Sequence, residues 1–461
     1  MNLVSFEYIA FISFFFVVTL LFGGKVKKIV LLTASFLFVI LYGNYYHAAW
    51  IYGTALYIYL AGLLLQKSRN KFVIGVLIAP VVLSLLFFKY NGFFEFENIV
   101  MPLGISFYTF RAISYLVDLS EQRSNTVSFL DTLIYLSFFP SVTAGPIQRI
   151  GDFAEQINKK QEKFDYLKYK NAAVQCALGM FQKLVFADYL SGVCNAIFSY
   201  EDSHGILLIC GAILYSFQLY LDFDGYSNMA IGASKLFGIE MKKNFHTPYL
   251  AQSIIEFWNR WHISLSTWLK RYIYIPLGGN RKGVFRKYIN ILIVFVISGL
   301  WHGSTYVFLI WGIGHGVVNI VENIIASCLK KYKLFSNPGF IQRWFKRMVN
   351  FIVVTILWVF FRSENLPQAI AIFNNMLVFD RSSLNYLAAG ITNREVIWII
   401  TILFTTFVTD LMRNKTDMIV WLSKRNVLLR WSFYILLIFV ALVFGAYGPG
   451  HNAADFIYAS F

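Results

Sequence analysis

The stretch from residue 289 to residue 313 reads INILIVFVISGLWHGSTYVFLIWGI and decides the class of this protein. It contains no Asp, Glu, Lys or Arg, and two apolar runs, Ile289–Ile297 and Tyr306–Ile313, flank a single histidine, His302. A helix needs about 20 mostly apolar residues to cross the roughly 30 Å hydrocarbon core of a bilayer. We therefore predict that both runs belong to membrane-spanning helices and that His302 lies within the membrane.

Similar apolar runs recur along all 461 residues, of which 58% are hydrophobic and 14% are charged. Soluble domains are typically about 25% charged, so this composition argues against a chain of soluble domains. The first run, Phe6–Phe22, lacks a basic start and a small-residue cleavage site, and we interpret it as a retained helix rather than a signal peptide. The predicted spans are residues 5–23, 29–43, 47–65, 73–88, 101–118, 128–145, 172–195, 206–222, 287–301, 304–327, 347–361, 396–414 and 430–447.

The fold class that this pattern predicts is an all-α polytopic membrane protein, with roughly a dozen transmembrane and re-entrant helices in a single domain, residues 1–461. Residues 128–145 are the re-entrant candidate, because the polar segments on both sides, 121–123 and 148–170, are expected to be cytoplasmic. Pro140 suits a broken helix that protein or water surrounds.

The chain has 40 basic and 24 acidic residues, which give a formal charge of +16. A soluble protein with this charge would suggest a nucleic-acid partner, but here most of the charge falls between spans, which favours contact with anionic lipid headgroups. The alternative is that some of the basic residues hold a phosphorylated substrate. Loops 25–28 and 67–71 are basic, whereas the loop between them, 43–47, has no Lys or Arg. The positive-inside rule then predicts an extracytoplasmic N-terminus.

The stretch FWNRWHISLSTWLKR, residues 257–271, is too polar for a helix that faces lipid and too aromatic for an ordinary loop. Arg260, His262 and Lys270 would each be costly in hydrocarbon. The segment can lie flat at the membrane surface as an amphipathic helix, or it can enter the protein and line a hydrated cavity. The residues alone leave both possibilities open.

An ionisable residue inside a membrane is a candidate functional residue, and His302 meets that description. Gly299 and Gly303 stand four residues apart and permit close approach of another backbone or a ligand. The alternative is a neutral His302 that hydrogen-bonds across helices, and the residues do not decide between the two. His315, further along the same region, is predicted to pack rather than to react.

A third polar cluster follows the apolar run that ends near residue 221. Asp222 and Asp224 need partners or water at this position. They could bind a cation, orient a histidine or pair with Arg260 or Arg271, and we favour structural pairing.

The absence of several motifs excludes known enzyme classes. There is no HExxH, no HxxxH or HxxHH box and no GxxxxGK[ST] loop, which argues against zinc proteases, di-iron desaturases and P-loop ATPases. We predict no bound metal. A histidine general base remains, which would take a proton from a hydroxyl so that its oxygen attacks an activated carbonyl.

Residues 257–281, which end in YIYIPLGGNR, resemble the signature of the membrane-bound O-acyltransferases. They are most similar to the bacterial branch of alginate and peptidoglycan O-acetyltransferases. The remaining segments of the resemblance follow in family order within about residues 100–320: 102–108 (PLGISFY), 144–147 (AGPI), 222–232 (DFDGYSNMAIG) and 299–303 (GLWHG).

The resemblance implies a helical bundle around a central pore, in the cytoplasmic (inner) membrane of a bacterium. It implies that His302 is the catalytic histidine and that His262 is a second functional one. It also implies that an acyl thioester, usually acetyl-coenzyme A, enters from the cytoplasm as a substrate and not as a bound cofactor. The acceptor, a polysaccharide or a serine of an extracytoplasmic partner acetyltransferase, enters from the opposite face.

On this basis we expect His302 to act as general base, while His262 and Asn259 position the thioester or stabilise the oxyanion. Basic residues are expected to hold the phosphates of coenzyme A, and further polar and aromatic residues to contact the substrates. The basic residues are Arg260, Lys270, Arg271 and Arg281, and the others are Trp261, Ser264, Trp301 and Asp222.

Three other functions stay open. The related D-alanyl transferases of teichoic acid share the Trp-His features, although they usually lack a run like residues 272–279 after the first histidine. A glycan or lipid transporter could use the histidines as a proton relay. A scaffold could anchor a partner enzyme without performing the transfer itself.

Overall fold

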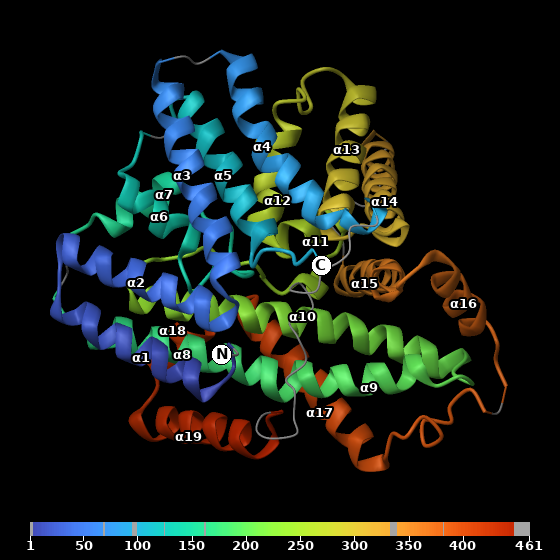
Figure 1. The fold of residues 1–461 in the computed structure, drawn as a ribbon. Coiled ribbons are helices and arrows are strands. Elements are labelled where there is room, and N and C mark those ends of the chain that lie inside the picture. The colour runs from blue at the N-terminus through green and yellow to red at the C-terminus, as the bar shows by residue number, and fades with distance from the viewer. Residues whose placement is uncertain are drawn as a thin grey trace.

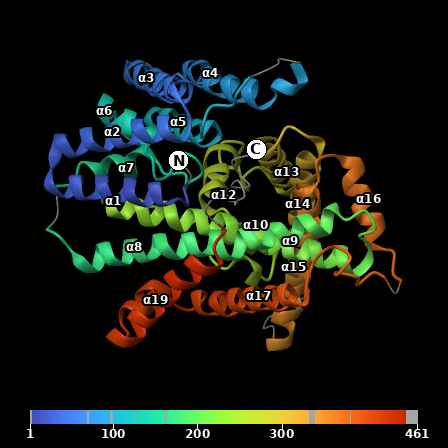
Figure 2. The same cartoon turned by 60° about the horizontal axis from the view of Figure 1, so that its bottom comes forward.

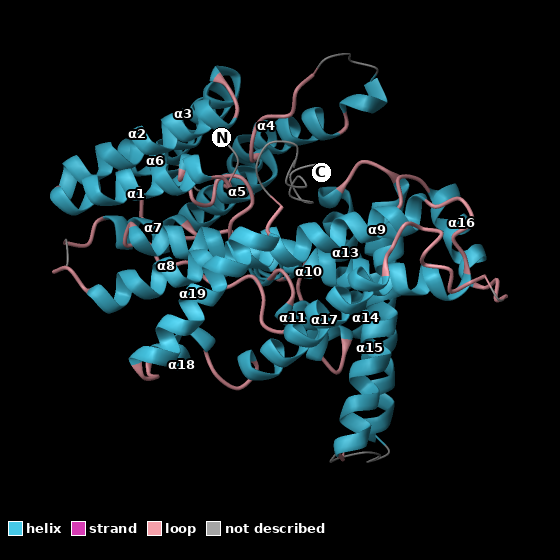
Figure 3. Ribbon diagram, turned by 90° about the horizontal axis from the view of Figure 1, so that it is seen from below, coloured by secondary structure: helices cyan, strands magenta, loops and turns pink. Residues whose placement is uncertain are grey.

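The computed structural model describes residues 3–67, 70–94, 99–123, 125–160, 163–331, 339–380 and 382–446. Within these ranges every regular element is a helix, as the colouring of Figure 3 shows. Eight of the described helices are long and apolar enough to cross a membrane, which confirms the predicted all-α polytopic membrane protein. They are α3 (Tyr45–Lys67), α4 (Lys71–Lys89), α10 (Gly205–Leu236), α13 (Val284–His302), α14 (Tyr306–Lys331), α15 (Phe340–Arg362), α17 (Asn393–Arg413) and α19 (Val427–Phe444).

The outer helices present large apolar side chains on the surface of the molecule. Leu428 of α19 is 80% exposed and Phe285 of α13 is 79% exposed, and Leu437 is the one buried residue of α19. A soluble monomer rarely exposes contiguous apolar surface of this extent. These faces therefore fit the hydrocarbon of a bilayer.

The N-terminal helices form one side of the molecule (Figure 1). α1 (Phe6–Leu21) and α2 (Gly24–Tyr42) pack together, and α3 and α4 pack against α5 (Ile105–Ser120). The predicted re-entrant segment contains only a short helix, α6 (Phe129–Ser137), followed by turns over 138–145. Nine residues rise about 13 Å, less than half of the hydrocarbon thickness, so α6 does not span it, as predicted.

A buried arginine donates hydrogen bonds to backbone carbonyls in this short helix and in the turn that follows it. Arg111 of α5 is 1% exposed, and its guanidinium donates to the carbonyl oxygens of Tyr135 (3.3 Å) and Ser141 (2.7 Å). Non-helical backbone inside a membrane protein needs such partners, because lipid offers none. Arg111 therefore holds the turn that follows α6 in place.

Three consecutive helices pack along the long helix α10. α8 (Tyr166–Phe181) continues through the π-helix η2 (Gln182–Ala187) into α9 (Asp188–Ser199), and the three run alongside α10. The predicted spans 172–195 and 206–222 were too short here. α10 continues through the polar residues after Leu221 because protein side chains, not lipid, surround them.

The aromatic-basic stretch is broken into α11 (Ile254–Arg260) and α12 (Ile263–Leu269), followed by the π-helix η4 (Lys270–Tyr274). Figure 2 places α12 near the centre of the molecule, between α10 and α13. Trp261 is 1% exposed and His262 is fully buried, so the segment enters the protein and the flat interfacial helix is wrong. The remaining elements are η1 (Asn91–Phe94), α7 (Ile150–Ile157), η3 (Pro248–Leu250), α16 (Leu366–Met376) and α18 (Met418–Ser423).

Candidate active site

His262 occupies the break between α11 and α12 in a left-handed backbone conformation, with φ 42° and ψ 53°. Residues other than glycine rarely adopt this conformation, and it persists only where surrounding contacts impose it. Here the amide of Ile263 donates to the carbonyl of Asn244 (2.9 Å), and the amide of His246 donates to the carbonyl of Arg260 (2.9 Å). Backbone pairing on both sides therefore fixes the direction of the His262 side chain.

The side chains of both predicted histidines contact the ring of Trp301. The His302 ring centroid lies 4.7 Å from that of Trp301, and the His262 centroid lies 6.0 Å from it. Two further aromatic residues enclose His302: Trp311 at 4.9 Å and Phe361 at 5.4 Å. Histidines from the broken segment and from the end of α13 thus contact the same indole ring.

Burial keeps the imidazole of His262 neutral. His262 lies between α11 and α12, outside the candidate spans, and burial lowers its pKa to about 3. His302 is 2% exposed and sits at the last position of α13. A neutral imidazole can accept a proton at one nitrogen and donate a hydrogen bond from the other, as acid-base catalysis requires.

Gly299 allows α13 and α14 to approach closely, as predicted, and Gly312 of α14 does the same from the facing helix. A β-carbon at Gly299 would lie 2.4 Å from the carbonyl oxygen of Phe308, and one at Gly312 would lie 2.4 Å from that of Phe295. His315 of α14 is fully buried, and its Nδ1 accepts a hydrogen bond from Trp258 Nε1 (3.3 Å). Its contacts fit the predicted packing role.

A cavity of about 600 Å³ reaches the segment that carries His262. Its lining includes Ser264 of α12 and two arginines, Arg149 and Arg271. Both arginines contact the buried carboxylate of Asp118, at 2.8 Å (Arg149 Nε to Oδ2) and 3.3 Å (Arg271 NH2 to Oδ1). Asp118 therefore holds two guanidinium groups at the wall of the cavity.

The other basic residues expected at the donor phosphates do not join this cavity. Lys270 and Asn259 line a smaller one of about 160 Å³, beside Trp258. Arg281 lies in an exposed turn. Arg260 pairs with Glu256 (NH2 to Oε1, 2.7 Å) and belongs to a separate polar network.

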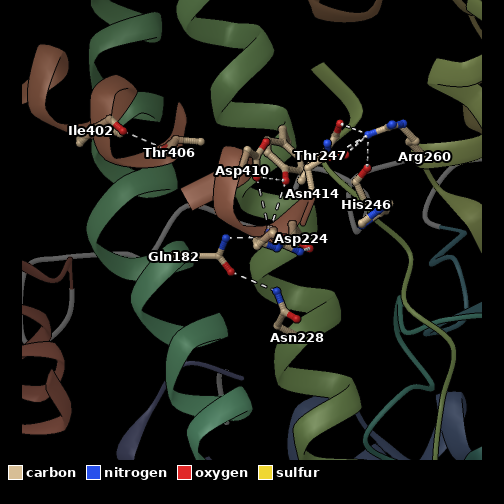
Figure 4. A network of polar contacts seen from close by, with 12 residues as sticks. Gln182, Asp224, Asn228, His246, Thr247, Arg260, Ile402, Thr406, Asp410 and Asn414 are labelled. Carbon is tan, nitrogen blue, oxygen red and sulfur yellow. Dashed lines mark hydrogen bonds and ion pairs between the residues drawn. The ribbon is translucent and has the colours of Figure 1, made fainter. Parts of the chain in front are cut away.

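That network surrounds Asp224 (Figure 4). Arg413 NH1 lies 2.6 Å from Asp224 Oδ2, and Tyr220 donates to Asp410 Oδ1 (2.9 Å). Arg260 reaches the network through Asn414 Oδ1, to which its NH1 donates (2.9 Å). Asp410 and Arg413 also line another cavity of about 600 Å³.

Asp222 and Asp224 are structural, as favoured from the sequence, but neither proposed arginine is their partner. Asp222 Oδ1 lies 2.6 Å from Lys183 Nζ, which also contacts Asp188 (2.8 Å). The expected pairing with Arg260 or Arg271 was wrong, because α8 and η2 lie closer to α10 and supply Lys183. Asp222 therefore pairs with Lys183 in the interior, and its contact with substrate stays a prediction.

Two residues at the site were not found from the sequence. Arg149 looked like one of many basic residues in a polar segment. Lys89 ends α4, and its Nζ lies 5.8 Å from the ring centroid of Trp301. One signal was available: a lysine at the end of a span where the positive-inside rule predicts few basic residues. Among the described residues no group of three His, Cys, Asp or Glu could hold a metal ion.

The fold and the paired buried histidines define an integral membrane enzyme of the acyl-transfer type. The model of the membrane-bound O-acyltransferase family matches residues 83–363, a range that includes both histidines. The chain belongs to this family, and it is a membrane-bound O-acyltransferase.

Three relatives show the range of similarity. The chain is 34% identical to the probable alginate O-acetylase AlgI of Pseudomonas syringae pv. tomato, over 81% of this chain and 74% of the relative. It is 33% identical to the peptidoglycan O-acetyltransferase of Helicobacter pylori, over 76% and 75%. It is 28% identical to the teichoic acid D-alanyltransferase of Bacillus subtilis, over 64% and 78%.

Proposed function

We propose that this enzyme transfers an acetyl group from acetyl-coenzyme A to hydroxyl groups of an extracytoplasmic polysaccharide, directly or through a partner acetyltransferase. The observation that carries the proposal is the pair of buried histidines on Trp301. The similarity to enzymes named for O-acetylation of alginate and peptidoglycan supports acetyl as the acyl group.

In the proposed mechanism His302 is the general base. Its neutral imidazole takes the proton of the acceptor hydroxyl, and the oxygen attacks the thioester carbonyl. The neutral His262 donates a hydrogen bond to the resulting oxyanion. The carbon–sulfur bond then breaks, and the imidazolium of His302 returns its proton to the leaving thiolate, so that free coenzyme A and the acetyl ester are the products.

In this proposal acetyl-coenzyme A binds in the cavity of about 600 Å³ that Ser264 lines, which is called the donor cavity below. Guanidinium groups bind phosphate oxygens in bidentate fashion, and Arg149 and Arg271 present two of them at its wall. This assignment replaces Arg260, Lys270 and Arg281 as the phosphate ligands. The thioester would then extend past Ser264 toward His262.

The proposed orientation places this cavity on the cytoplasmic side of a bacterial inner membrane. Lys28 of the first basic loop lies 2.7 Å from Asp131 Oδ1, and it donates to Asn158 Oδ1 (2.5 Å) in the second polar segment. Two segments that the positive-inside rule assigns to the cytoplasm therefore meet at one end of the molecule, which supports the assignment. Lys159 and Lys168, which belong to the same polar segment as Asn158, also line the donor cavity.

The test uses purified protein in lipid vesicles with labelled acetyl-coenzyme A. We expect release of free coenzyme A that depends on a polysaccharide acceptor. The H302Q variant should lose about 10²-fold or more of this activity while inserting normally. His204→Gln is the control, since His204 lies in the turn before α10 and contacts Asp380 instead of the site.

Other results would point elsewhere. Full activity of the H302Q variant would rule out His302 as the base. Transport of a glycan without loss of the thioester would favour the transporter. Transfer of D-alanine from a D-alanyl thioester, without transfer of acetyl, would favour the teichoic acid reaction.

A further inference from the structure

Lys89 stands against the same indole that the two histidines contact. Its Nζ lies 5.8 Å from the ring centroid of Trp301 and is attracted by the face of that ring. Among the residues that the structure describes, Lys89 has no carboxylate partner and no hydrogen bond. When its amine is protonated, Lys89 therefore brings to the site a charge that no described residue balances.

The position of this cation is fixed by its neighbours. The hydroxyl of Tyr90 donates to the carbonyl of Leu300 (3.0 Å), which ties the end of α4 to the end of α13. The side-chain amide of Asn91 donates to the carbonyl of Ile99 (3.3 Å). The end of α4 is therefore held beside the helix end that carries His302.

The environment of Lys89 differs from that of an ordinary lysine at a membrane surface. A lysine near a helix end usually extends its ammonium group into water beside the headgroups. Lys89 is instead partly buried and turned toward Trp301. An unpaired charge in such surroundings is unfavourable until an anion binds to it.

The donor phosphates do not account for Lys89. Arg149 and Arg271 serve them at the donor cavity, whose lining does not include Lys89. Lys89 ends α4 at the helix end opposite Lys71, which belongs to a basic loop assigned to the cytoplasm. In the proposed orientation Lys89 thus faces the side from which the acceptor arrives.

We infer that Lys89 binds an anionic group of the acceptor, a carboxylate or a phosphate, next to the hydroxyl that is acylated. The inference rests on the proposed function and narrows it, because it makes the acceptor an acidic polymer. The charge contact would orient the hydroxyl toward His302, and Lys89 would be a specificity-determining residue that takes no part in proton transfer.

The test compares three acceptors with the full-length enzyme in vesicles. They are oligomannuronate, the neutral oligomannose obtained by reducing its carboxyl groups, and oligo(glycerol phosphate). The first two share one glycan backbone and differ at C6, where a neutral hydroxymethyl group replaces the carboxylate, so ester is counted only on the ring hydroxyls that both carry. The third separates phosphate from carboxylate. The readouts are acyl ester on the acceptor, KM for the acceptor, and release of coenzyme A.

We expect the wild type to prefer at least one anionic acceptor over the neutral one. The K89Q variant should raise KM for that acceptor about 10- to 100-fold with little change in kcat, because one hydrogen bond to a charged group is lost. K89R should keep most of the preference. Lys71→Gln, at the other end of the same helix, should leave both constants unchanged.

Failure of the inference is distinct from failure of the proposed function. If the wild type shows no preference for an anionic acceptor, or if K89Q lowers kcat equally for charged and neutral acceptors, Lys89 does not recognise acceptor charge. If no coenzyme A is released from acetyl-coenzyme A with any acceptor, the proposed acetyl transfer itself is wrong.

Discussion

His262 combines a reactive side chain with an unusual backbone, and the two can be separated by substitution. Its φ of 42° disfavours most residues but suits asparagine, which tolerates the left-handed region. H262N and H262A both remove the imidazole, so we expect both to lose most activity. We also expect H262A to be less stable than H262N by about 1 kcal/mol, which thermal unfolding in detergent can measure.

Equal stability of the two variants would mean that the backbone at this position is not strained. Wild-type activity in H262N would show that the imidazole itself is dispensable.

The donor cavity makes a second prediction at the scale of single residues. Replacing Arg149 or Arg271 with Gln should raise KM for acetyl-coenzyme A about 10- to 100-fold, since each removes a charged contact to phosphate. Arg281→Gln should have little effect, because Arg281 is exposed and lies outside the cavity lining. Steady-state kinetics with the three variants distinguishes this arrangement from the one expected from sequence.

A single site residue can be predicted from the sequence when its type contrasts with that of its neighbours. His302 could be found because a histidine between apolar runs is unusual. Lys89 offered one weak signal, a basic residue at a span end where few are expected, and Arg149 offered none; only the fold brings these two to the site. The partners of Asp222 depend on helix contacts that no local pattern encodes.

The contact between α13 and α14 makes a prediction at the scale of elements. G299A and G312A each place a methyl group 2.4 Å from a carbonyl oxygen, so we expect a loss of about 1–3 kcal/mol in stability. Activity should fall as well, because Gly299 and His302 share one helix. Gly53→Ala in α3 is the control: its β-carbon meets nothing within 4 Å, and stability should not fall.

The network in Figure 4 links α10 to α17 and makes another prediction. R413Q should destabilise the protein by about 3–5 kcal/mol, since it removes the ion-pair partner of the buried Asp224 and leaves only the amide of Gln182 (3.1 Å) on that carboxylate. D224N should be milder, because Arg413 keeps Asp410 at 3.9 Å. The double variant should lose less than the sum of both, which a double-mutant cycle by denaturant unfolding can test.

At this scale the apolar runs predicted most long helices, and the polar stretches were harder to assign. Hydropathy ended the prediction for α10 near residue 222, yet the helix continues to Leu236 because Lys183 and Arg413 accompany its acids. The break at His262 was left open, because a broken helix and an interfacial helix have the same composition. Buried contacts decide between them.

Orientation is a property of the whole molecule, and it can be tested without an activity. In a background with all four cysteines replaced by serine, single cysteines are placed at Lys25 and at the exposed Tyr45. An impermeant maleimide added to intact cells should label Tyr45→Cys, and it should label Lys25→Cys only after lysis. The reverse pattern would place the N-terminus in the cytoplasm and invert both cavities.

The residues that surround His302 also determine at which point of its synthesis the chain can form the active site. Trp311 and Phe361, which enclose the imidazole, lie on α14 and α15, whereas Trp301 and His302 end α13. A nascent chain that has inserted only as far as α13 would present His302 to lipid or water without its aromatic walls. Ribosomes must therefore translate past residue 361 before a reaction centre can form, and a chain that terminates earlier would lack this enclosure.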